Sequence, residues 1–474
     1  MHLKFYKKLI HLHFVREIYL IIRSKKNTED EENYLVSYIE LLKKLVSFPT
    51  VNNPIENKIP SNEILLYIGE EILKPLGYQN MFYEINDYSS LISYLNRGSP
   101  KILFLGHCDV VPEGLDWETD PFELTIKGER AYGRGTADMK GAVSTMLSLA
   151  KDFADAEKGS IIYLLNLDEE SGGVYGAGKV FEYLNKHDLV PDFVINGDAN
   201  GLQVVNKRRN SFVANLKLRK TLNKVSGRKN NRIFTTKIAG NRTMHAAYFM
   251  KDIDTHCVDK ASNFLRKNNY MVQSLKGNFV KNNVLPSEIR IEYIIPDEKS
   301  NQEYEYDENL TKFIHSAYTL KDVDIPSDPS DYGINLTFNY YRDEEEHHLC
   351  QLDLRIMSKS MDDVQKYFEK FINDSAIDAV IETKGSTSPV HTDKDSKLVK
   401  ISLKVAKEMG LSHYPIEMGG ATDSRWFSAR GIPSIEFGPL GGNVHGSNEY
   451  VELSSLEVIR KFYLRLFSSL LVAD

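Results

Sequence analysis

Short apolar runs and helical repeats alternate through the first half of the chain. A continuous apolar run suits a strand covered on both faces, and apolar residues three and four apart suit a helix with one buried side. The predicted strands are 102–105, 160–167 and 192–196, and the predicted helices are 34–46, 61–76, 142–153 and 180–186. Two further strands are expected to pair around residues 97–100, the second of them leading to His107. This alternation predicts an α/β sheet.

The pattern changes near Lys207. Residues 207–232 are rich in lysine and arginine, which suits either attraction of an anionic substrate or a solvated hairpin face, and we favour the hairpin. The elements predicted next are strands 233–240, 288–295, 350–357 and 376–384, helices 254–267 and 360–373, and a polar insertion at 297–348. They predict a small α+β domain. The α/β pattern then resumes with helices at 396–409 and about 454–470.

Three parts follow from this change of pattern. We expect a basic N-terminal extension at 1–30, a catalytic domain made of 31–207 and 389–474, and an inserted domain at 208–388. A chain of 474 residues is long enough for two domains.

Charge and cysteine content exclude several classes of protein. The net charge of −7 and the pI near 6.1 leave no basic excess to neutralise phosphates, so we expect no nucleic-acid partner. The three cysteines, Cys108, Cys257 and Cys350, lack CxxC spacing. They indicate neither a disulfide framework nor a thiolate zinc site, and they suit a cytoplasmic location.

The first 26 residues alternate basic and apolar side chains. Their longest apolar run, 18–22, is far shorter than the roughly 20 residues of a membrane span. An amphipathic helix on a membrane surface and a frayed or docked extension both fit. We favour the extension and expect no membrane contact.

Acids and histidines follow several predicted strands and turns. Five of them suit a two-metal site of imidazole and carboxylate ligands: His107, Asp138, Glu170, Asp198 and His445. Asp109 shares a face with His107 and is spaced to accept a hydrogen bond from its imidazole. This ligand set favours two Zn(II) ions, with Co(II) or Mn(II) as alternatives. Singly, each residue is as well explained by a structural role.

Asp168, Glu169 and Glu170 stand together at one strand end. Unless the strand breaks there, alternation would put Asp168 and Glu170 on one side and Glu169 on the other, so one acid can ligate while another takes a proton from water. A negative loop that caps the next helix explains the same residues equally well.

A second motif suggests a different class of protein. Residues 173–179 (GVYGAGK) fit most of a phosphate-binding loop, which would indicate a nucleotide hydrolase. Val180 replaces the hydroxyl that would bind magnesium, and the three preceding acids would repel a triphosphate. We therefore disfavour this interpretation.

The combined motifs resemble the co-catalytic dizinc metallopeptidase family that contains acetylornithine deacetylase, succinyl-diaminopimelate desuccinylase, aminoacylase-1 and glutamate carboxypeptidase. The segments that carry the resemblance are GHCDVVP (106–112), WETDPFE (117–123), YGRGTADMKGA (132–142), DEESGG (168–173), INGD (195–198), LDLR (352–355), GGATDSRWF (419–427), GIPSIEFGP (431–439) and VHGSNEYV (444–451). The implied fold is a zinc-exopeptidase-like mixed sheet with helices on both faces, plus an inserted α+β lid and dimerisation domain.

The resemblance also implies roles for the candidate ligands. One metal would be held by His107 and Asp198 and the other by Glu170 and His445, with Asp138 between them and Asp109 behind His107. Glu169 would be the general base and then the general acid. The peptide bond Asp138–Met139 would be cis.

Within the inserted domain, the resemblance makes His245 a candidate oxyanion donor and Asn283 and Arg355 candidate contacts for the substrate carboxylate. Arg425 is a similar candidate in the catalytic domain. The chain would form a homodimer through the lid. Tyr248 and Phe249 stand where the family often has a proline, and 217–232 and 297–348 are longer than a usual lid.

These implications predict a metal-dependent hydrolase that cleaves the amide bond of N-acyl amino acids, of the deacetylase or desuccinylase type, through a dimetal-bridged water and Glu169. A dipeptidase or carboxypeptidase acting on small peptides is the alternative within hydrolases. A catalytically inactive metal-binding protein is the alternative from a different class.

Overall fold

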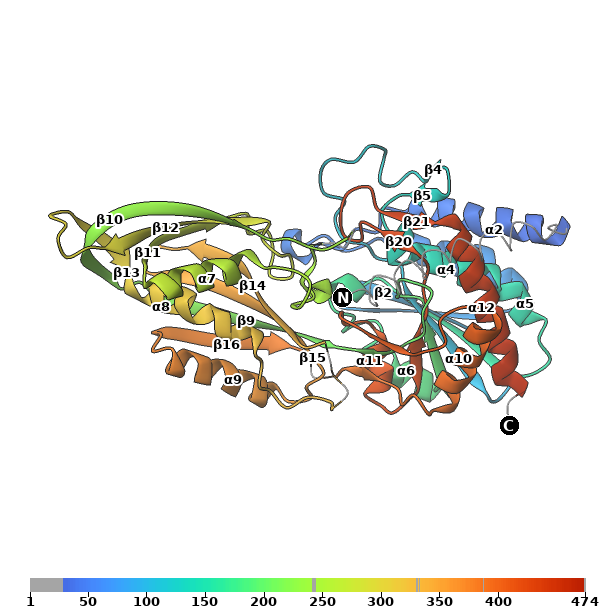
Figure 1. Cartoon of the computed structure of the whole chain (residues 1–474). Helices are drawn as coiled ribbons and strands as arrows, with labels where there is room; N and C mark the ends of the chain where they lie inside the picture. The colour runs from blue at the N-terminus through green and yellow to red at the C-terminus, as the bar shows by residue number, and fades with distance from the viewer. Residues whose placement is uncertain (1–28, 241–243, 330, 332, 387, 473–474) are drawn as a thin grey trace. The chain divides into compact units, whose positions relative to one another are not determined.

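The computed structural model describes residues 29–240, 244–329, 331, 333–386 and 388–472, and it forms two compact units (Figure 1). Unit 1 comprises the described residues up to Lys207, Val390–Ile416 and those from Thr422 onward. Unit 2 comprises Arg208–Pro389 and Glu417–Ala421. The catalytic and lid roles of these segments stay predictions. The expectation that the N-terminal extension makes no membrane contact concerns residues 1–28, which lie outside the described residues.

A mixed sheet runs through unit 1. Its strand order is β1-β2-β6-β3-β7-β19-β8-β17. The bounds are β1 (Gln79–Ile85), β2 (Tyr88–Leu95), β6 (Ser160–Asn166), β3 (Lys101–His107), β7 (Phe193–Asn196), β19 (Ser434–Glu436), β8 (Val205–Arg208) and β17 (Val390–His391). β3 runs parallel to β6 and β7, and β19 runs parallel to β7, whereas β1 and β2 form an antiparallel edge.

The predicted pairing of two strands around residues 97–100 is wrong. β2 lies antiparallel to β6, and β3 lies parallel to β6, so β6 separates them. The connection instead crosses the start of β6, where Ser160 Oγ donates to Gly98 O at 2.7 Å and Ser160 N donates to Pro100 O at 3.0 Å. Neighbours in sequence need not pair when a later strand with a stronger apolar run can enter between them.

Helices cover both faces of this sheet, as the resemblance implies. Ile102 and Phe104 of β3 belong to one core with the helices α2, α4, α10 and α12. Leu103 and Leu105 belong to the opposite core with α6 and α11. The bounds are α2 (Glu29–Val46), α4 (Gly141–Ser148), α6 (Phe181–Lys186), α10 (Lys397–Glu408), α11 (Ser424–Ser428) and α12 (Leu453–Val472), and α5 (Ala150–Ala154) continues from α4. The helix predicted at 61–76 is α3 (Glu63–Leu66) extended by π-helical and 3₁₀ turns to Leu76.

A small second sheet of unit 1 has the order β20-β21-β5-β4. Its strands are β20 (Gly441–Gly442), β21 (Tyr450–Glu452), β5 (Arg130–Tyr132) and β4 (Thr125–Lys127). Pairing of β21 with β5 brings the loop 443–449 beside the turn that begins at residue 133. Two of the predicted ligands lie in these loops.

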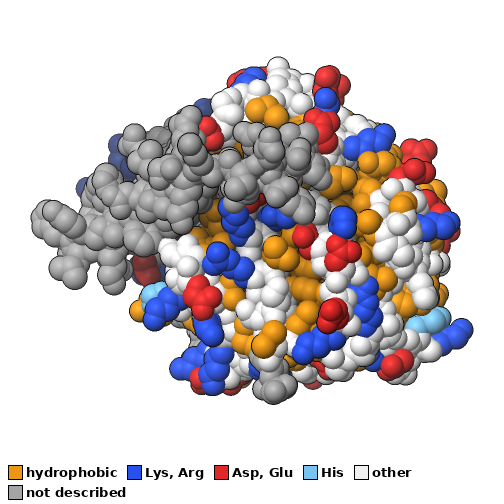
Figure 2. Space-filling model, turned by 90° about the vertical axis from the view of Figure 1, so that its right-hand side faces the viewer, with side chains coloured by type: hydrophobic (Ala, Val, Ile, Leu, Met, Phe, Trp, Pro, Cys, Tyr) orange, Lys and Arg blue, Asp and Glu red, His pale blue; other side chains and the backbone are white. Residues whose placement is uncertain are grey.

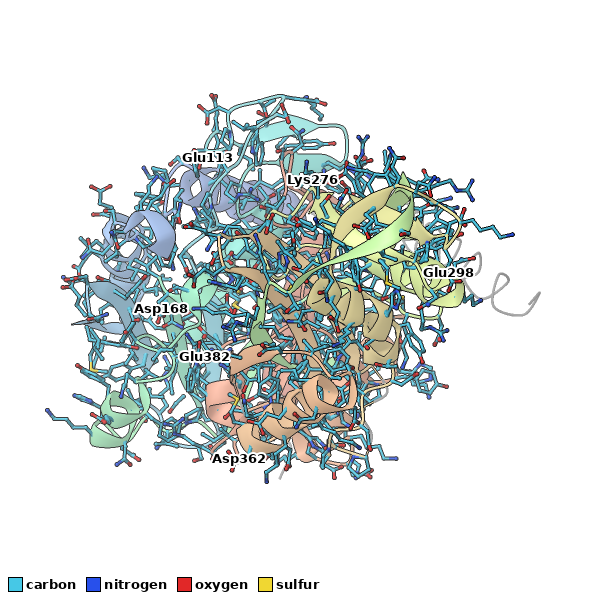
Figure 3. The ribbon with its side chains drawn as sticks, turned by 90° about the vertical axis from the view of Figure 1, so that its left-hand side faces the viewer. Glu113, Asp168, Lys276, Glu298, Asp362 and Glu382 are labelled. Carbon is cyan, nitrogen blue, oxygen red and sulfur yellow. The ribbon has the colours of Figure 1, made fainter. Side chains whose placement is uncertain are left out.

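Unit 2 contains two antiparallel sheets, with the orders β11-β12-β10-β13 and β14-β15-β9-β16. The strands are β9 (Asn210–Arg219), β10 (Leu222–Thr235), β11 (Met271–Gly277), β12 (Glu288–Pro296), β13 (Glu303–Asp307), β14 (Asn335–Asp343), β15 (His347–Ile356) and β16 (Ala379–Gly385), and the helices are α7 (Cys257–Asn268), α8 (Glu308–Ser316) and α9 (Met361–Asp374). The four charged side chains of unit 2 labelled in Figure 3 are all exposed: Lys276, Glu298, Asp362 and Glu382. The fold class of α/β plus inserted α+β is confirmed.

Two predictions for this region are wrong in detail. The polar insertion at 297–348 contains β13, α8 and β14, because alternating tyrosines and acids hide a strand pattern. Most basic side chains of 207–232 are exposed, although Arg208 is buried, and the stretch is no hairpin. β9 pairs with β15 and β16, and β10 pairs with β12 and β13.

None of the helices in the described ranges combines the length and apolar character that crossing a bilayer requires. On the face seen in Figure 2, acidic and basic side chains are interspersed among the coloured atoms, and no surface of one sign extends across it.

A buried histidine makes the stability of unit 2 depend on pH. His256 begins α7, where its Nδ1 accepts a hydrogen bond from Val258 N at 3.2 Å, and its side chain is buried. Burial lowers the pKa of His256 to about 4, although a hydrogen bond with Asn339 opposes the shift. Below a pH of about 6.5 the unfolded chain therefore binds a proton that the folded unit does not.

We predict that His256 lowers the free energy of unfolding of unit 2 by about 2 kcal/mol as the pH falls from 7 to 5, because the unfolded chain then binds a proton that the folded unit does not. His256→Asn keeps a capping acceptor but does not titrate. Its urea unfolding midpoint should therefore fall less over this range than that of the wild type. His413→Asn, at an exposed position, is the control and should keep the wild-type dependence. If the unfolding midpoint depends on pH equally in the wild type and His256→Asn, protonation of His256 does not cause the loss of stability.

Candidate metal centre

The carboxyl edge of the parallel strands gathers the predicted ligands. His107 ends β3, Glu170 follows β6 and Asp198 follows β7, and these strands are neighbours. The turn before α4 brings Asp138 to the same place, and the loop between β20 and β21 brings His445. Because parallel strands end at one edge of a sheet, residues far apart in sequence meet there.

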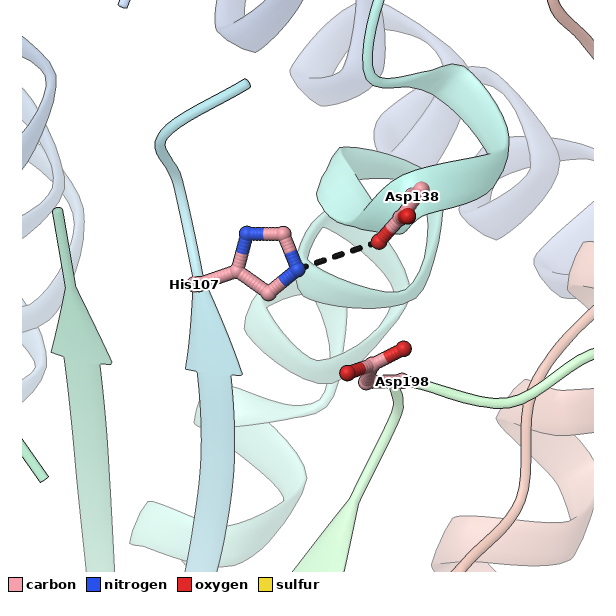
Figure 4. A group of neighbouring side chains, drawn as sticks. All are labelled: His107, Asp138 and Asp198. Atoms are coloured by element: carbon pink, nitrogen blue, oxygen red, sulfur yellow. Dashed lines mark hydrogen bonds and ion pairs between the residues drawn. The ribbon is translucent and has the colours of Figure 1, made fainter. Parts of the chain in front are cut away.

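These five residues form two groups that share Asp138. The first is His107, Asp138 and Asp198, shown in Figure 4, and the second is Asp138, Glu170 and His445. In each group one ligand atom per residue lies within 4.8 Å of the others. The two groups match the ligand sets that the resemblance implies.

Asp138 lies between two imidazoles. Its Oδ1 is 3.1 Å from His107 Nε2 and its Oδ2 is 3.1 Å from His445 Nε2. The preceding turn uses Gly135 at φ 85°, a left-handed conformation that glycine adopts without a steric cost. The peptide bond Asp138–Met139 is cis, as predicted. Asp138 can therefore offer one oxygen to each group.

Asp109 supports His107 and the acids beside it. His107 Nδ1 is 3.0 Å from the main-chain oxygen of Asp109 and 3.5 Å from its Oδ1. A proton on Nδ1 that is donated to this oxygen leaves Nε2 free to ligate. The Asp109 carboxylate also accepts from the main-chain nitrogens of Glu169 at 3.3 Å and Glu170 at 3.0 Å. Asp109 thus joins the end of β3 to the segment after β6.

Asn52 completes this network and was missed by the sequence analysis. Its Nδ2 donates to Asp109 Oδ2 at 2.8 Å and to Ser171 Oγ at 3.1 Å. Tyr88 in turn donates to Asn52 Oδ1 at 3.3 Å. Asn52 lies in a polar loop with no recognisable spacing to the acids, so no sequence signal identified it.

The three acids after β6 do not follow strand alternation. β6 ends at Asn166, and Glu169–Ser171 forms a 3₁₀ turn. Asp168, labelled in Figure 3, accepts from the main-chain nitrogens of Tyr175 at 2.7 Å and Gly176 at 3.0 Å. Asp168 therefore holds the following loop in place, and Glu170 alone of the three joins a ligand group.

The charges of this cluster are poorly balanced. Burial by itself lowers the pKa of His107, but hydrogen bonds with Asp109 and Asp138 outweigh it and raise that pKa well above the usual value. Burial raises the pKa of Glu169 well above its usual range; His107 opposes this rise, and the carboxylates of Asp198 and Asp423 add to it. Buried acids close together favour a bound cation, because its charge offsets their repulsion.

Arg425 lies in the same unit but is engaged elsewhere. Its Nη2 donates to the main-chain oxygen of Gly172, and its guanidinium lies 4.8 Å from the centre of the Trp426 ring. The side chain is buried. Arg425 therefore contacts the turn after Glu169, and its role toward a substrate stays a prediction.

The other predicted contacts belong to unit 2. His245 and Asn283 are neighbours there, with Asn283 Nδ2 3.2 Å from His245 Nε2. Arg355 on β15 forms a two-fold pair with Asp353, with distances of 2.6 Å and 2.8 Å. His245 and Asn283 are thus brought together, and Arg355 has a carboxylate partner of its own.

Comparison with known proteins now identifies the chain. Residues 103–469 match the model of peptidase family M20/M25/M40. The chain belongs to this family. As a family member it is a hydrolase that acts on amide bonds, and its two ligand groups fit the metal dependence of M20 enzymes.

Curated M20 relatives align along almost the whole chain. The succinyl-diaminopimelate desuccinylase of Buchnera aphidicola subsp. Acyrthosiphon pisum is 27% identical over 451 residues, which cover 92% of this chain and 99% of the relative. The enzyme of the same name from Helicobacter pylori is 24% identical over 454 residues, covering 91% and 98%. The likeness therefore includes both units.

Solved structures share the M20 fold. The aminoacylhistidine dipeptidase of Vibrio alginolyticus has a TM-score of 0.63 at 15% identity, covering 91% of this chain and 96% of its own. An M20 family metallo-carboxypeptidase from Sulfolobus solfataricus has a TM-score of 0.59 at 17% identity, covering 92% and 99%. At such identities the likeness establishes the fold alone.

The donor set fits divalent cations. Ligand atoms about 2.0–2.2 Å from one tetrahedrally bound cation lie roughly 3.3–3.6 Å from each other, so side chains that are already this close need only a small inward shift to share one. Each group of this M20 chain spans no more than 4.8 Å, and each combines imidazole nitrogen with carboxylate oxygen. Zn(II), Co(II) and Mn(II) accept such mixed ligands.

We predict that His445→Ala weakens binding of one metal equivalent and spares the other, because His445 belongs only to the second group. The loss should exceed the roughly 10- to 100-fold that follows removal of an outer partner of a ligand. Competition with a coloured chelator measures both equivalents. His413→Ala, which removes an exposed imidazole, should bind both metals as the wild type does. Two equivalents bound by His445→Ala at full affinity would mean that another residue is the ligand.

Proposed function

We propose that this M20 hydrolase cleaves the amide bond of N-acyl amino acids, in the manner of a deacetylase or desuccinylase. The observation that carries the proposal is the pair of ligand groups sharing Asp138, with Glu169 in the segment that supplies Glu170. Such an arrangement can bind two cations and still leave one carboxylate free for proton transfer.

The curated relatives support the choice of substrate class. Those from Buchnera aphidicola and Helicobacter pylori are named succinyl-diaminopimelate desuccinylases, and they align over at least nine-tenths of this chain. Succinyl-diaminopimelate is an N-acyl amino acid. We propose the wider class of N-acyl amino acids, because identities of 24–27% are too low to assign this chain the acyl group or the amino acid of its relatives' substrate.

Each residue then has a defined task. His107, Asp198, Glu170, His445 and the shared Asp138 would hold two divalent cations, with Zn(II) as our proposal. Bound there, the cations supply a Lewis acid for the substrate carbonyl and lower the pKa of the attacking water.

Glu169 moves the proton. Its carboxylate accepts the proton of the attacking water and then donates it to the leaving nitrogen. Glu169 belongs to neither ligand group, so its carboxylate stays available to hold the proton between these two events. Asp109 keeps Glu169 in place by accepting from its main-chain nitrogen.

Unit 2 is proposed as the lid and dimerisation domain. His245 would donate a hydrogen bond to the developing oxyanion. Asn283, next to His245, is a better candidate than Arg355 for the substrate carboxylate, because Arg355 already donates twice to Asp353. We also propose a cytoplasmic location, since Cys108, Cys257 and Cys350 are all free and buried.

A hydrolysis screen tests the substrate class. Purified protein is given N-succinyl amino acids, N-acetyl amino acids and dipeptides, each with added Zn(II), Co(II) or Mn(II). Faster release of amino acids from the N-acyl compounds supports the proposal. Faster cleavage of dipeptides would replace it with a peptidase. Two bound metals without hydrolysis of any substrate would favour a metal-binding protein without activity.

We predict that Glu169→Gln lowers kcat about 10²- to 10⁴-fold, because the amide cannot accept the proton of the attacking water. Both metals should remain bound, since Glu169 belongs to neither ligand group. Stopped assays on the best substrate of the screen give kcat, and metal analysis gives the occupancy. Glu182→Gln, an exposed exchange of the same kind, should leave kcat unchanged. Near-native turnover by metal-loaded Glu169→Gln would remove Glu169 from the mechanism.

A further inference from the structure

Glu449 is a buried acid that neither the sequence analysis nor the mechanism uses. It is 1% exposed and lies four residues after His445, in the loop that leads to β21. Its side chain points into the turn that carries Asp138, where its two oxygens accept four hydrogen bonds. A carboxylate surrounded in this way acts as an acceptor only, and such buried acids need a structural or functional reason.

The contacts of Glu449 surround the chain just before Asp138. Glu449 Oε1 accepts from the main-chain nitrogens of Ala137 at 2.8 Å and Asp138 at 3.1 Å. Glu449 Oε2 accepts from the main-chain nitrogen of Gly135 at 3.0 Å and from Arg134 Nη1 at 2.6 Å. Hydrogen bonds to a charged acceptor are the stronger kind. The position of the Asp138 backbone is therefore fixed by a residue of the His445 loop.

The same residue also restrains His445. His445 has a φ of 62°, and its loop neighbours Asn443 and Asn448 have φ values of 54° and 56°. A left-handed φ is unfavourable for side chains other than glycine, more so for His445 than for the two asparagines, so this loop needs an anchor to keep its shape. Glu449 supplies one through its carboxylate, and its main-chain oxygen accepts from Gly133 N at 3.0 Å.

Arg134 extends the anchor to the other wall of the site. Besides pairing with Glu449, its Nη2 donates to the main-chain oxygens of Pro112 and Glu113, each at 3.1 Å. These residues follow His107 and Asp109 along the chain. The Arg134–Glu449 pair thus joins three segments that carry predicted ligands.

We propose that Glu449 is a positioning residue that holds Asp138 and His445 at the separation that the second metal requires. This inference rests on the proposed function, because it takes Asp138 and His445 as ligands. Glu449 contacts no substrate and binds no metal in this proposal. It acts by fixing the backbone of one ligand and the loop of the other.

Glu449→Gln tests the proposal. Glutamine has the same shape, but only one of its two terminal atoms can accept, so either the Ala137 and Asp138 nitrogens or the Gly135 and Arg134 donors lose their partner. We expect the second equivalent of Co(II) to bind about 10- to 100-fold more weakly and the first to be weakened less, because Asp138 belongs to both groups but His445 only to the second. Absorbance titration with Co(II) follows both steps. kcat at limiting metal should fall and recover at high metal concentration, whereas KM should stay close to the wild-type value.

Two further variants make the outcome decisive. Glu452→Gln removes an acid three residues later, at the end of β21, that does not contact the Asp138 turn, and it should bind both equivalents as the wild type does. If Glu449→Gln does not fold, Glu449→Asp keeps the charge but is too short to reach all four donors, and the same loss of the second equivalent is expected. Thermal unfolding in excess chelator compares the stability of the metal-free wild type with that of each metal-free variant.

The results separate this proposal from the proposed function. If the wild type binds two equivalents and hydrolyses an N-acyl amino acid while both Glu449 variants keep the wild-type ratio of the two affinities, the positioning role is wrong and the function stands. Equal weakening of both equivalents would also overturn it, because restraint of the His445 loop should affect the second group more than the first. If the wild type itself binds fewer than two equivalents of Co(II), the proposed two-metal site is wrong, and the positioning role of Glu449 falls with it.

Discussion

Repulsion between half-buried carboxylates is the constraint on which the rest of unit 1 depends. Asp138, Glu169, Glu170 and Asp198 gather at one edge of a sheet whose strands are otherwise apolar. His107 and His445 supply part of the positive charge, and Asp138 keeps a pKa well below its usual range because, although burial opposes it, hydrogen bonds with both imidazoles favour the anion. The remaining imbalance makes divalent cations the natural completion of the site.

Much of this arrangement can be predicted from the chain. Apolar runs at 102–105 and 160–167 predicted β3 and β6, because strands covered on both faces must be apolar throughout. Acids and histidines at the ends of such runs pointed to one edge of the sheet. The resemblance then implied which residues share a metal, and the groups around Asp138 have that composition.

Other features could not be predicted because they depend on tertiary contacts. The order β2-β6-β3 requires a later strand to enter between two earlier ones, and no local pattern records this. Asp168 accepts from the amides of Tyr175 and Gly176, and alternation does not apply to it because the strand ends before it, at Asn166. Asn52 supports Asp109 from a loop distant in sequence. In unit 2, tyrosines alternating with acids concealed β13.

The place where unit 2 is inserted has a consequence for how the protein can be built or divided. The chain leaves the sheet of unit 1 through β8 and returns through β17, which are neighbours in that sheet. Asn206 Nδ2 donates to Thr392 O at 2.7 Å, and Thr392 N donates to Asn206 O at 2.9 Å. Exit and return therefore lie side by side, so a short linker could join them, with Glu417–Ala421 as the one further described segment that belongs to unit 2. Such an arrangement lets the inserted unit be gained, lost or exchanged between proteins while the strand edge that carries the ligands remains intact.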